Sequence, residues 1–276
     1  MGGESEQLVS IPSPVLQPFV RRYTWHRYQG VAPGVHHVVP SRHVTVMVSL
    51  GDPLRVEMPG LAAECVFAAV VGGLHTALAK VAHDGHGCGV GVELTPRGVR
   101  ALLGMPAGVI GSTVVDLHGS WGRWPGELAE RLFFASSWRA RVQVLNCVFS
   151  GLVCEAGEPP SAVAEAWTRL MRCGGNLQIA ALASDLGVSR RRLSERFRAE
   201  YGLSPKQAAR VFRFERAAAL IDGAGPGSLA RVAADCGYFD QAHLDQEWRA
   251  LTGLTPTSWM AQEIRDPRDE GLTAAT

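Results

Sequence analysis

Two segments in the C-terminal half of the chain repeat each other, and this repeat constrains the fold more than any other feature of the sequence. Matched residues lie 50 positions apart in the first part of each copy and 51 positions apart after one inserted residue. The matched pairs are Ile179/Leu229, Ala180/Ala230, Ala183/Ala233, Asp185/Asp235, Gly187/Gly237, Leu193/Leu244, Phe197/Trp248, Gly202/Gly253, Leu203/Leu254 and Pro205/Pro256. This many aligned positions indicates one structural unit present twice.

Each copy has the pattern of a short amphipathic helix, a turn that contains glycine, and a second helix. The second helix is expected to bury two side chains four positions apart, Leu193 with Phe197 in one copy and Leu244 with Trp248 in the other. A short helix, a tight turn and a second helix form a helix-turn-helix, whose second helix lies in the major groove of DNA. The sequence therefore predicts two DNA-reading units.

Capping residues and a connecting helix complete the pattern. Ser189 and Asp240 stand where N-caps would begin the second helices, and Ser204-Pro205 begins a helix that runs to about Ile221 and ends near Gly223. A rigid connector of this kind would hold the two units at a fixed separation. Two reader helices could then enter successive major grooves, about 34 Å apart on one face of the duplex.

The stretch from about Asn176 to Gln262 resembles the DNA-binding domain of AraC/XylS-type transcription regulators, over about a third of the chain. The resemblance rests on the tandem pair at the right spacing, on GLSPK at the start of the connector with its Arg213, and on the strings GYFDQAHL and TGLTP. It implies a sequence-specific DNA-binding protein that acts on promoter DNA, with RNA polymerase as a further partner.

On the first reader helix, basic and polar side chains form a row that faces away from Leu193 and Phe197. Arginine can pair with a guanine edge through two hydrogen bonds, and a carboxylate can accept one from cytosine. The resemblance places Arg191, Ser194 and Glu195 at bases and Arg190, Arg192 and Arg198 at phosphates. Arginine is frequent in the family at the position of Glu195, which would either read cytosine or relieve charge crowding.

The second reader helix is more acidic, because Asp240, Asp245 and Glu247 are opposed only by His243 and Arg249. The resemblance places Gln241, Ala242, Asp245 and Gln246 at base edges, and Arg249 joins them as a DNA-binding candidate. We expect the first unit to supply most of the specificity and the second to bind loosely.

The N-terminal part has a different composition, rich in Val, Gly, Pro and His. Buried strands are expected at Val44 to Leu50 and Cys65 to Val71. Helical spacing begins near Trp121, and Glu155 to Ser161 is the best linker candidate. The strings HHVVPSRHVTVMVSLGD, GVELTPRGVRALLGMPAG and VVDLHGSWG resemble N-terminal domains of AraC-like proteins, which are often cupin-like barrels that bind a small effector, mediate dimerisation, or do both.

The predicted fold class is α+β in two domains. Residues 1–118 form a β-rich, cupin-like effector-sensing or dimerisation domain, and residues 119–160 a helical connection and linker. Residues 161–262 form the all-α domain with two helix-turn-helix units, and residues 263–276 a disordered tail.

Histidines are frequent in the N-terminal domain, but we predict neither a metal site nor a cofactor. His83, His86 and Cys88 lie in the glycine-rich string HDGHGCG. This composition favours a polar hairpin turn over a set of metal ligands. His36 and His37 alternate along a strand, so at most one of them would face a given pocket.

No enzyme is predicted, because the chain lacks a nucleophile elbow, a phosphate loop and an HExxH motif. A metal-dependent cupin-type enzyme fused to a DNA-binding domain is one alternative. A helix-turn-helix scaffold that acts through protein contacts is the other, and it would show no salt-dependent DNA affinity.

Charge and hydropathy limit the partners further. The net charge is +1, from 27 basic and 26 acidic residues, so any site for a polyanion must be local. Every apolar run is shorter than the roughly 18 residues of a membrane span, and the N-terminus lacks a signal-peptide pattern, so no membrane partner is expected. The sequence thus predicts a cytoplasmic regulator that responds to an effector of unknown identity and can form a homodimer. The operator and the direction of regulation stay open.

Overall fold

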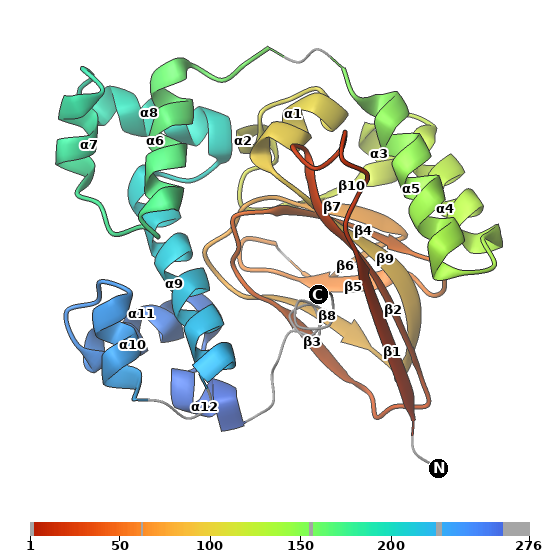
Figure 1. The fold of residues 1–276 in the computed structure, drawn as a ribbon. Coiled ribbons are helices and arrows are strands. Elements are labelled where there is room, and N and C mark those ends of the chain that lie inside the picture. The colour runs from red at the N-terminus through yellow and green to blue at the C-terminus, as the bar shows by residue number, and fades with distance from the viewer. Residues whose placement is uncertain (1–2, 62, 155–156, 225–227, 262–276) are drawn as a thin grey trace.

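The computed structural model describes residues 3–61, 63–154, 157–224 and 228–261. Two antiparallel sheets form the N-terminal domain and face each other as a cupin-like barrel (Figure 1). The six-stranded sheet has the order β1 (Glu4–Ser10), β2 (Val20–Gln29), β9 (His86–Leu94), β4 (Val44–Ser49), β7 (Ala69–Gly72) and β10 (Val114–Asp116). The four-stranded sheet has the order β3 (Gly34–Val38), β8 (Ala79–His83), β5 (Leu54–Glu57) and β6 (Cys65–Phe67).

The main apolar face of the six-stranded sheet is turned away from the barrel interior. Tyr23 and Trp25 of β2 belong to the largest hydrophobic core, together with alternate valines of β4 and β9. Their neighbours Thr24 and His26 line the interior cavity instead. Since side chains alternate along a strand, successive residues of β2 point in turn to the packed outer face of the sheet and to the cavity on its inner face.

Three helices lie beside the barrel on the side of this outer face: α3 (Leu117–Ser120), α4 (Trp124–Phe134) and α5 (Trp138–Leu152). The Tyr23 hydroxyl donates to Asn146 Oδ1 of α5 at 3.2 Å, and the Arg141 guanidinium lies 4.1 Å from the centre of the Trp25 ring. The helices expected between residues 119 and 160 therefore pack on the sheet.

Two expectations for the barrel need correction. The strand expected from Cys65 to Val71 breaks at Ala68, where the chain passes from the four-stranded sheet to the six-stranded one, whereas the strand at Val44 is confirmed as β4. The turn expected between His83 and His86 exists, but it does not close a hairpin. Its flanking strands β8 and β9 belong to different sheets.

The C-terminal part has the two helix-turn-helix units that the repeat predicts. The helices are α6 (Ser161–Arg172), α7 (Ile179–Asp185), α8 (Arg190–Tyr201), α9 (Pro205–Ala224), α10 (Leu229–Asp235), α11 (Gln241–Thr252) and α12 (Pro256–Ala261). Both expected N-caps are confirmed: the Ser189 side chain accepts from the amide of Arg192, and that of Asp240 from the amide of His243. Gly187 and Gly237 have φ angles of 65° and 75°, which favour glycine at the two turns.

The hydrophobic cores divide within the connecting helix α9. Phe212 belongs to the large core that also contains the first helix-turn-helix unit and the barrel's outer face. Phe214 belongs to a second core built around Leu244 and Trp248. The first reading unit is thus packed continuously with the N-terminal domain. None of the helices in the described segments has the length and apolar character needed to span a bilayer, and the predicted tail of residues 263–276 lies outside those segments.

Candidate DNA interface and sensing cavity

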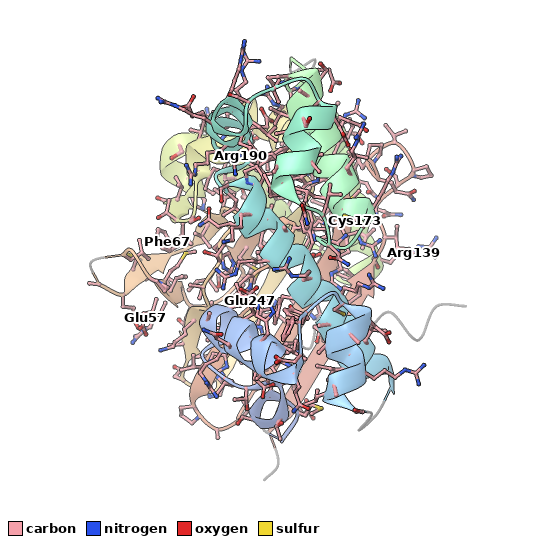
Figure 2. The ribbon with its side chains drawn as sticks, turned by 90° about the vertical axis from the view of Figure 1, so that its left-hand side faces the viewer. Glu57, Phe67, Arg139, Cys173, Arg190 and Glu247 are labelled. Atoms are coloured by element: carbon pink, nitrogen blue, oxygen red, sulfur yellow. The ribbon has the colours of Figure 1, made fainter. Side chains whose placement is uncertain are left out.

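The first reader helix, α8, presents its candidate residues to solvent while its opposite face is buried. Leu193 and Phe197 are buried, as the i, i+4 pattern predicts, and Phe197 packs beside Trp167 of α6. The candidates on the open face are Arg190, Arg191, Arg192, Glu195 and Arg198, all exposed, and Ser194, half-buried. Figure 2 is viewed from the side on which these helices lie, with Arg190 labelled on α8.

Arg191 and Glu195 form an ion pair across one turn of α8. Arg191 Nε donates to Glu195 Oε1 at 2.8 Å, and both side chains are largely exposed. An exposed pair of this kind stabilises the helix only slightly. Its importance is geometric, because two groups that the resemblance assigns to bases stand side by side before DNA arrives.

The second reader helix, α11, is less acidic at its surface than the sequence suggests. Glu247 is paired with Arg210 at 2.9 Å and with Arg213 at 3.3 Å, both on α9. Asp240 is used as the N-cap. The expectation that only His243 and Arg249 oppose the acids is therefore wrong, because the folded connector supplies two arginines that are remote in sequence.

Four of the five candidates on α11 are exposed, and the fifth, Asp245, is not. Asp245 is half-buried, and its Oδ1 atom is buried without a hydrogen bond among the described residues. The exposed candidates are Gln241, Ala242, Gln246 and Arg249. Arg213, which the resemblance singled out without a role, also donates to the Gly175 carbonyl and lies over Tyr238, so it ties the two units together.

The C-terminal end of α8 is bound to the N-terminal domain through α1 (Pro96–Leu103) and α2 (Ala107–Ile110). Arg100 of α1 pairs with the buried Glu200 through two contacts, Nε to Oε1 at 2.7 Å and Nη2 to Oε2 at 2.6 Å. Gly108 of α2 lies so close to α8 that a Cβ there would stand 2.3 Å from the Ala199 carbonyl oxygen. Sequence reasoning missed this contact, since no local pattern connects α1 and α2 with a helix about 100 residues further along the chain.

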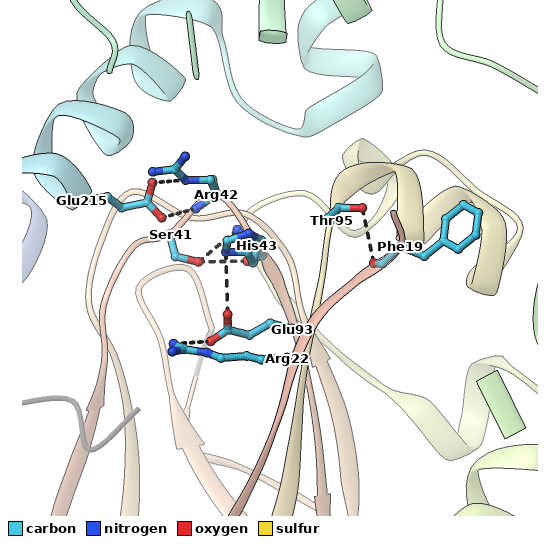
Figure 3. Close-up of polar contacts among 8 residues, drawn as sticks. All are labelled: Phe19, Arg22, Ser41, Arg42, His43, Glu93, Thr95 and Glu215. Carbon is cyan, nitrogen blue, oxygen red and sulfur yellow. Dashed lines mark hydrogen bonds and ion pairs between the residues drawn. The ribbon is translucent and has the colours of Figure 1, made fainter. Parts of the chain in front are cut away.

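A second ion pair joins the β3–β4 loop to α9 (Figure 3). Arg42 donates to the Glu215 carboxylate from its backbone amide at 2.9 Å and from Nε at 2.7 Å. Burial raises the pKa of the Glu215 carboxyl, and the Arg42 cation opposes that shift. Arg42 also lies over the Phe212 ring.

Behind this loop, a polar group connects the interface to the barrel interior (Figure 3). Glu93 lines the cavity and pairs with Arg22 at 2.8 Å. His43 Nδ1 lies 3.8 Å from Glu93, but burial lowers the pKa of His43 to about 4. His43 is therefore neutral near pH 7, and Arg22 is the charge that balances Glu93.

The interior of the barrel holds a cavity of about 270 Å³ between the inner faces of the two sheets. Its apolar lining includes Met47, Val56, Val70 and Val81. Four histidines also line it: His26, His36, His75 and His83. His37 is absent from the lining, as its alternation with His36 predicts. The described residues contain no group of three or more His, Cys, Asp or Glu side chains arranged to hold a metal ion.

Alternating glycines on β9 leave room for two of the rings that line this cavity. Gly87 and Gly89 pair across the sheet with Tyr28 and His26. A Cβ at Gly87 would stand 2.7 Å from the Tyr28 ring, and one at Gly89 would stand 3.0 Å from the His26 ring. The rings can lie against the sheet only because these positions lack side chains. The sequence interpretation of this string as a turn missed the part that forms a strand.

Comparison with known proteins bears on both halves of the molecule. Residues 182–262 match the family model described as a helix-turn-helix domain, and residues 9–116 match a domain of unknown function, DUF6597. The fold is similar over 95% of the chain to 98% of ToxT from Vibrio cholerae, with a TM-score of 0.51 and 8% sequence identity. The C-terminal part of the chain is therefore a helix-turn-helix domain of the AraC type.

A second ToxT structure, described as bound to an unsaturated fatty acid, has a TM-score of 0.53 and 8% identity. The similarity covers 86% of this chain and 94% of that one. Comparison with curated protein sequences gives no match. The helix-turn-helix match, on a fold that places a β-rich domain before tandem helix-turn-helix units as in ToxT, supports a DNA-binding transcription regulator.

Proposed function

We propose that the chain is an effector-responsive regulator that reads two successive major grooves of promoter DNA, with α8 and α11 as its recognition helices. The observation that carries this proposal is the exposure of the α8 row while the rest of that helix is packed. We assign Arg191, Ser194 and Glu195 to bases and Arg190, Arg192 and Arg198 to phosphates.

For the second groove we assign Gln241, Ala242, Asp245 and Gln246 to base edges and Arg249 to the backbone. The 20-residue α9, with Ser204 and Gln207 bonded to each other at its start, connects the two units. This reciprocal capping fixes the first turn of the connector. We expect α8 to supply most of the specificity, because α11 has only Arg249 as an exposed cation among its candidates.

The proposed effector site is the barrel cavity. Its volume is near the lower end of small-molecule sites, about 300 Å³, and its lining is apolar with a few polar groups. ToxT has been solved with an unsaturated fatty acid. We therefore choose small apolar carboxylates, including short unsaturated fatty acids, as the first ligands to test on this chain.

The proposed response passes through the docking of the two domains. Glu93 lines the cavity, and the loop beside it holds Glu215 of α9 through Arg42. A ligand that displaces Glu93 or the β3–β4 loop would change how α9 is held. The reading units would then meet DNA in a different relative position. We place this action in the cytoplasm, beside RNA polymerase, with the chain as a monomer or a homodimer.

The decisive experiment is a binding selection from genomic fragments with the full chain, repeated at several salt concentrations. An enriched motif with two half-elements about one helical turn apart supports the proposal. If no motif is enriched and affinity does not depend on salt, the DNA-reading proposal is rejected in favour of a scaffold that acts through protein contacts.

The effector site is tested by thermal unfolding of the full chain with each carboxylate. Val81→Phe should fill the cavity and abolish any increase in melting temperature, because a ligand stabilises only the state that binds it. Val66→Phe, on the exposed side of β6, is the matched control. Equal ligand responses in both variants would exclude the cavity as the site.

A further inference from the structure

The turn before α11 exposes an aromatic side chain with no counterpart in the first unit. Phe239 is 92% exposed. It lies between the buried Tyr238 and Asp240, the N-cap of α11. Single exposed apolar residues are ordinary on protein surfaces, so exposure alone indicates no function.

Alignment of the two units shows that Phe239 is the inserted residue. The amide of Val188 donates to the Ala183 carbonyl at 3.0 Å, and the amide of Tyr238 donates to the Ala233 carbonyl at 2.9 Å. Val188 and Tyr238 are therefore equivalent. In the first unit the N-cap Ser189 directly follows Val188. In the second unit Phe239 stands between Tyr238 and the N-cap Asp240.

The inserted residue has a fixed position. Its backbone amide donates to His243 Nδ1 at 3.2 Å, and the His243 ring contacts Tyr238 edge-on at 5.5 Å between ring centres. Asp240 caps α11 from the next position. Hydrogen bonds from backbone amides to the His243 and Asp240 side chains thus hold the turn at Phe239, while its ring stays in solvent.

Its location places it at the end of α11 that would enter the groove. The N-terminal residues of a recognition helix are those that contact base edges, and Gln241 and Ala242 follow Phe239 directly. Apolar side chains, phenylalanine among them, contact the thymine methyl group in the major groove. Such a contact needs no positive charge, which the exposed candidates of α11 supply only through Arg249.

We propose that Phe239 is a specificity-determining residue that contacts the methyl group of a thymine in the half-element read by α11. This inference rests on the proposed reading of DNA by both units. It assigns the second unit an apolar contact that the first unit lacks.

The test uses the operator duplex recovered by the full chain in the genomic selection. Phe239→Ala should lower affinity about tenfold, while Phe239→Leu should keep most of it. Replacing one thymine of the second half-element by deoxyuridine removes only the methyl group. That replacement should weaken the wild-type chain about tenfold and Phe239→Ala hardly at all.

Two controls separate this contact from other effects. Phe134→Ala removes another exposed phenylalanine, 75% exposed on α4 and remote from the reading units, and should leave affinity unchanged. The dependence of log affinity on log salt should be the same in Phe239→Ala and wild type, because no phosphate contact is lost.

Equal affinity of Phe239→Ala and wild type would overturn the inference while leaving the DNA-reading proposal intact. So would thymine replacements that weaken both chains alike. Unchanged DNA binding together with reduced transcription by RNA polymerase would assign Phe239 to a protein contact instead. Absence of any enriched motif would overturn both the inference and the function on which it rests.

Discussion

Arg42 and Glu215 lie 173 positions apart in sequence, yet Arg42 offers the Glu215 carboxylate both its backbone amide and its guanidinium. The side chains are 31% and 17% exposed, so the pair is only partly screened by water. It joins the β3–β4 loop, next to the barrel cavity, to the helix that connects the two helix-turn-helix units. The pair is a direct polar link between the barrel and α9.

Removing Arg42 should cost more than removing the whole pair. Arg42→Ala leaves Glu215 buried without its cation and should lower the free energy of unfolding by about 1 to 3 kcal/mol. The double variant Arg42→Met/Glu215→Met should lie close to wild type. Urea unfolding of wild type, Arg42→Met, Glu215→Met and the double variant completes a double-mutant cycle and gives the coupling free energy. Additive losses would mean that the two residues do not act as a pair.

Replacing Arg191 and replacing Arg198 should affect DNA binding in different ways. Arg191→Ala should cost about 1 to 3 kcal/mol in operator binding and relax selectivity at one base pair. Arg198→Ala should weaken all sequences alike and reduce the salt slope by about one. Because Arg191 is paired with Glu195, the Glu195→Ala variant is needed as a control. Equal, sequence-independent losses in Arg191→Ala and Arg198→Ala would refute the assignment of base and phosphate contacts.

Trp248 should tolerate loss of its indole nitrogen but not loss of its ring. Its side chain is 1% exposed, packs against Phe214, and has an Nε1 atom without a hydrogen bond among the described residues. Trp248→Ala should cost about 3 to 5 kcal/mol, and Trp248→Phe much less, since the unsatisfied donor disappears with the nitrogen. Thermal unfolding compares the two, and similar losses would show that the nitrogen has a partner.

Gly108→Ala should loosen the contact between α2 and α8, because the new methyl group would meet the Ala199 carbonyl. The expected cost is about 1 to 3 kcal/mol. Gly151→Ala is the matched control: nothing lies within 4 Å of a Cβ at this helical position, so it should stabilise the protein by up to about 1 kcal/mol. Shifts of the unfolding midpoint in the same direction for both variants, relative to wild type, would contradict the close approach of α2 to α8.

His43 should make stability depend on pH below neutrality. Its pKa in the folded protein is lowered to about 4 from an ordinary value near 6.5, so between these values the unfolded chain binds a proton that the folded chain does not. Stability from this residue is therefore complete above pH 6.5 and declines as pH falls towards 4, by about 3 kcal/mol in all. His43→Gln should flatten that part of the curve, and His86→Gln, on an exposed residue, should not. Parallel curves for wild type and His43→Gln would show that the burial of His43 has no such effect.

The C-terminal half was readable from the sequence because its structure is determined locally. Helix period, a capping residue such as Ser189 and a glycine such as Gly187 all act within a few positions. A duplication shows the same local signals twice. The row on α8 could be recognised for the same reason, since residues three and four apart on a helix share a face.

What only the tertiary structure decided depends on strand pairing and on contacts between distant segments. Strand alternation cannot tell which of two sheets will receive a segment, so the break at Ala68 and the role of Gly87 and Gly89 beneath aromatic rings became visible only with the register. Glu247 looked like an unfavourable acid until α9 brought Arg210 and Arg213 beside it. The ties from Arg42 to Glu215 and from Arg100 to Glu200 likewise join residues that no local signal connects, because burial and pairing energies act through space and leave no periodic trace in the sequence.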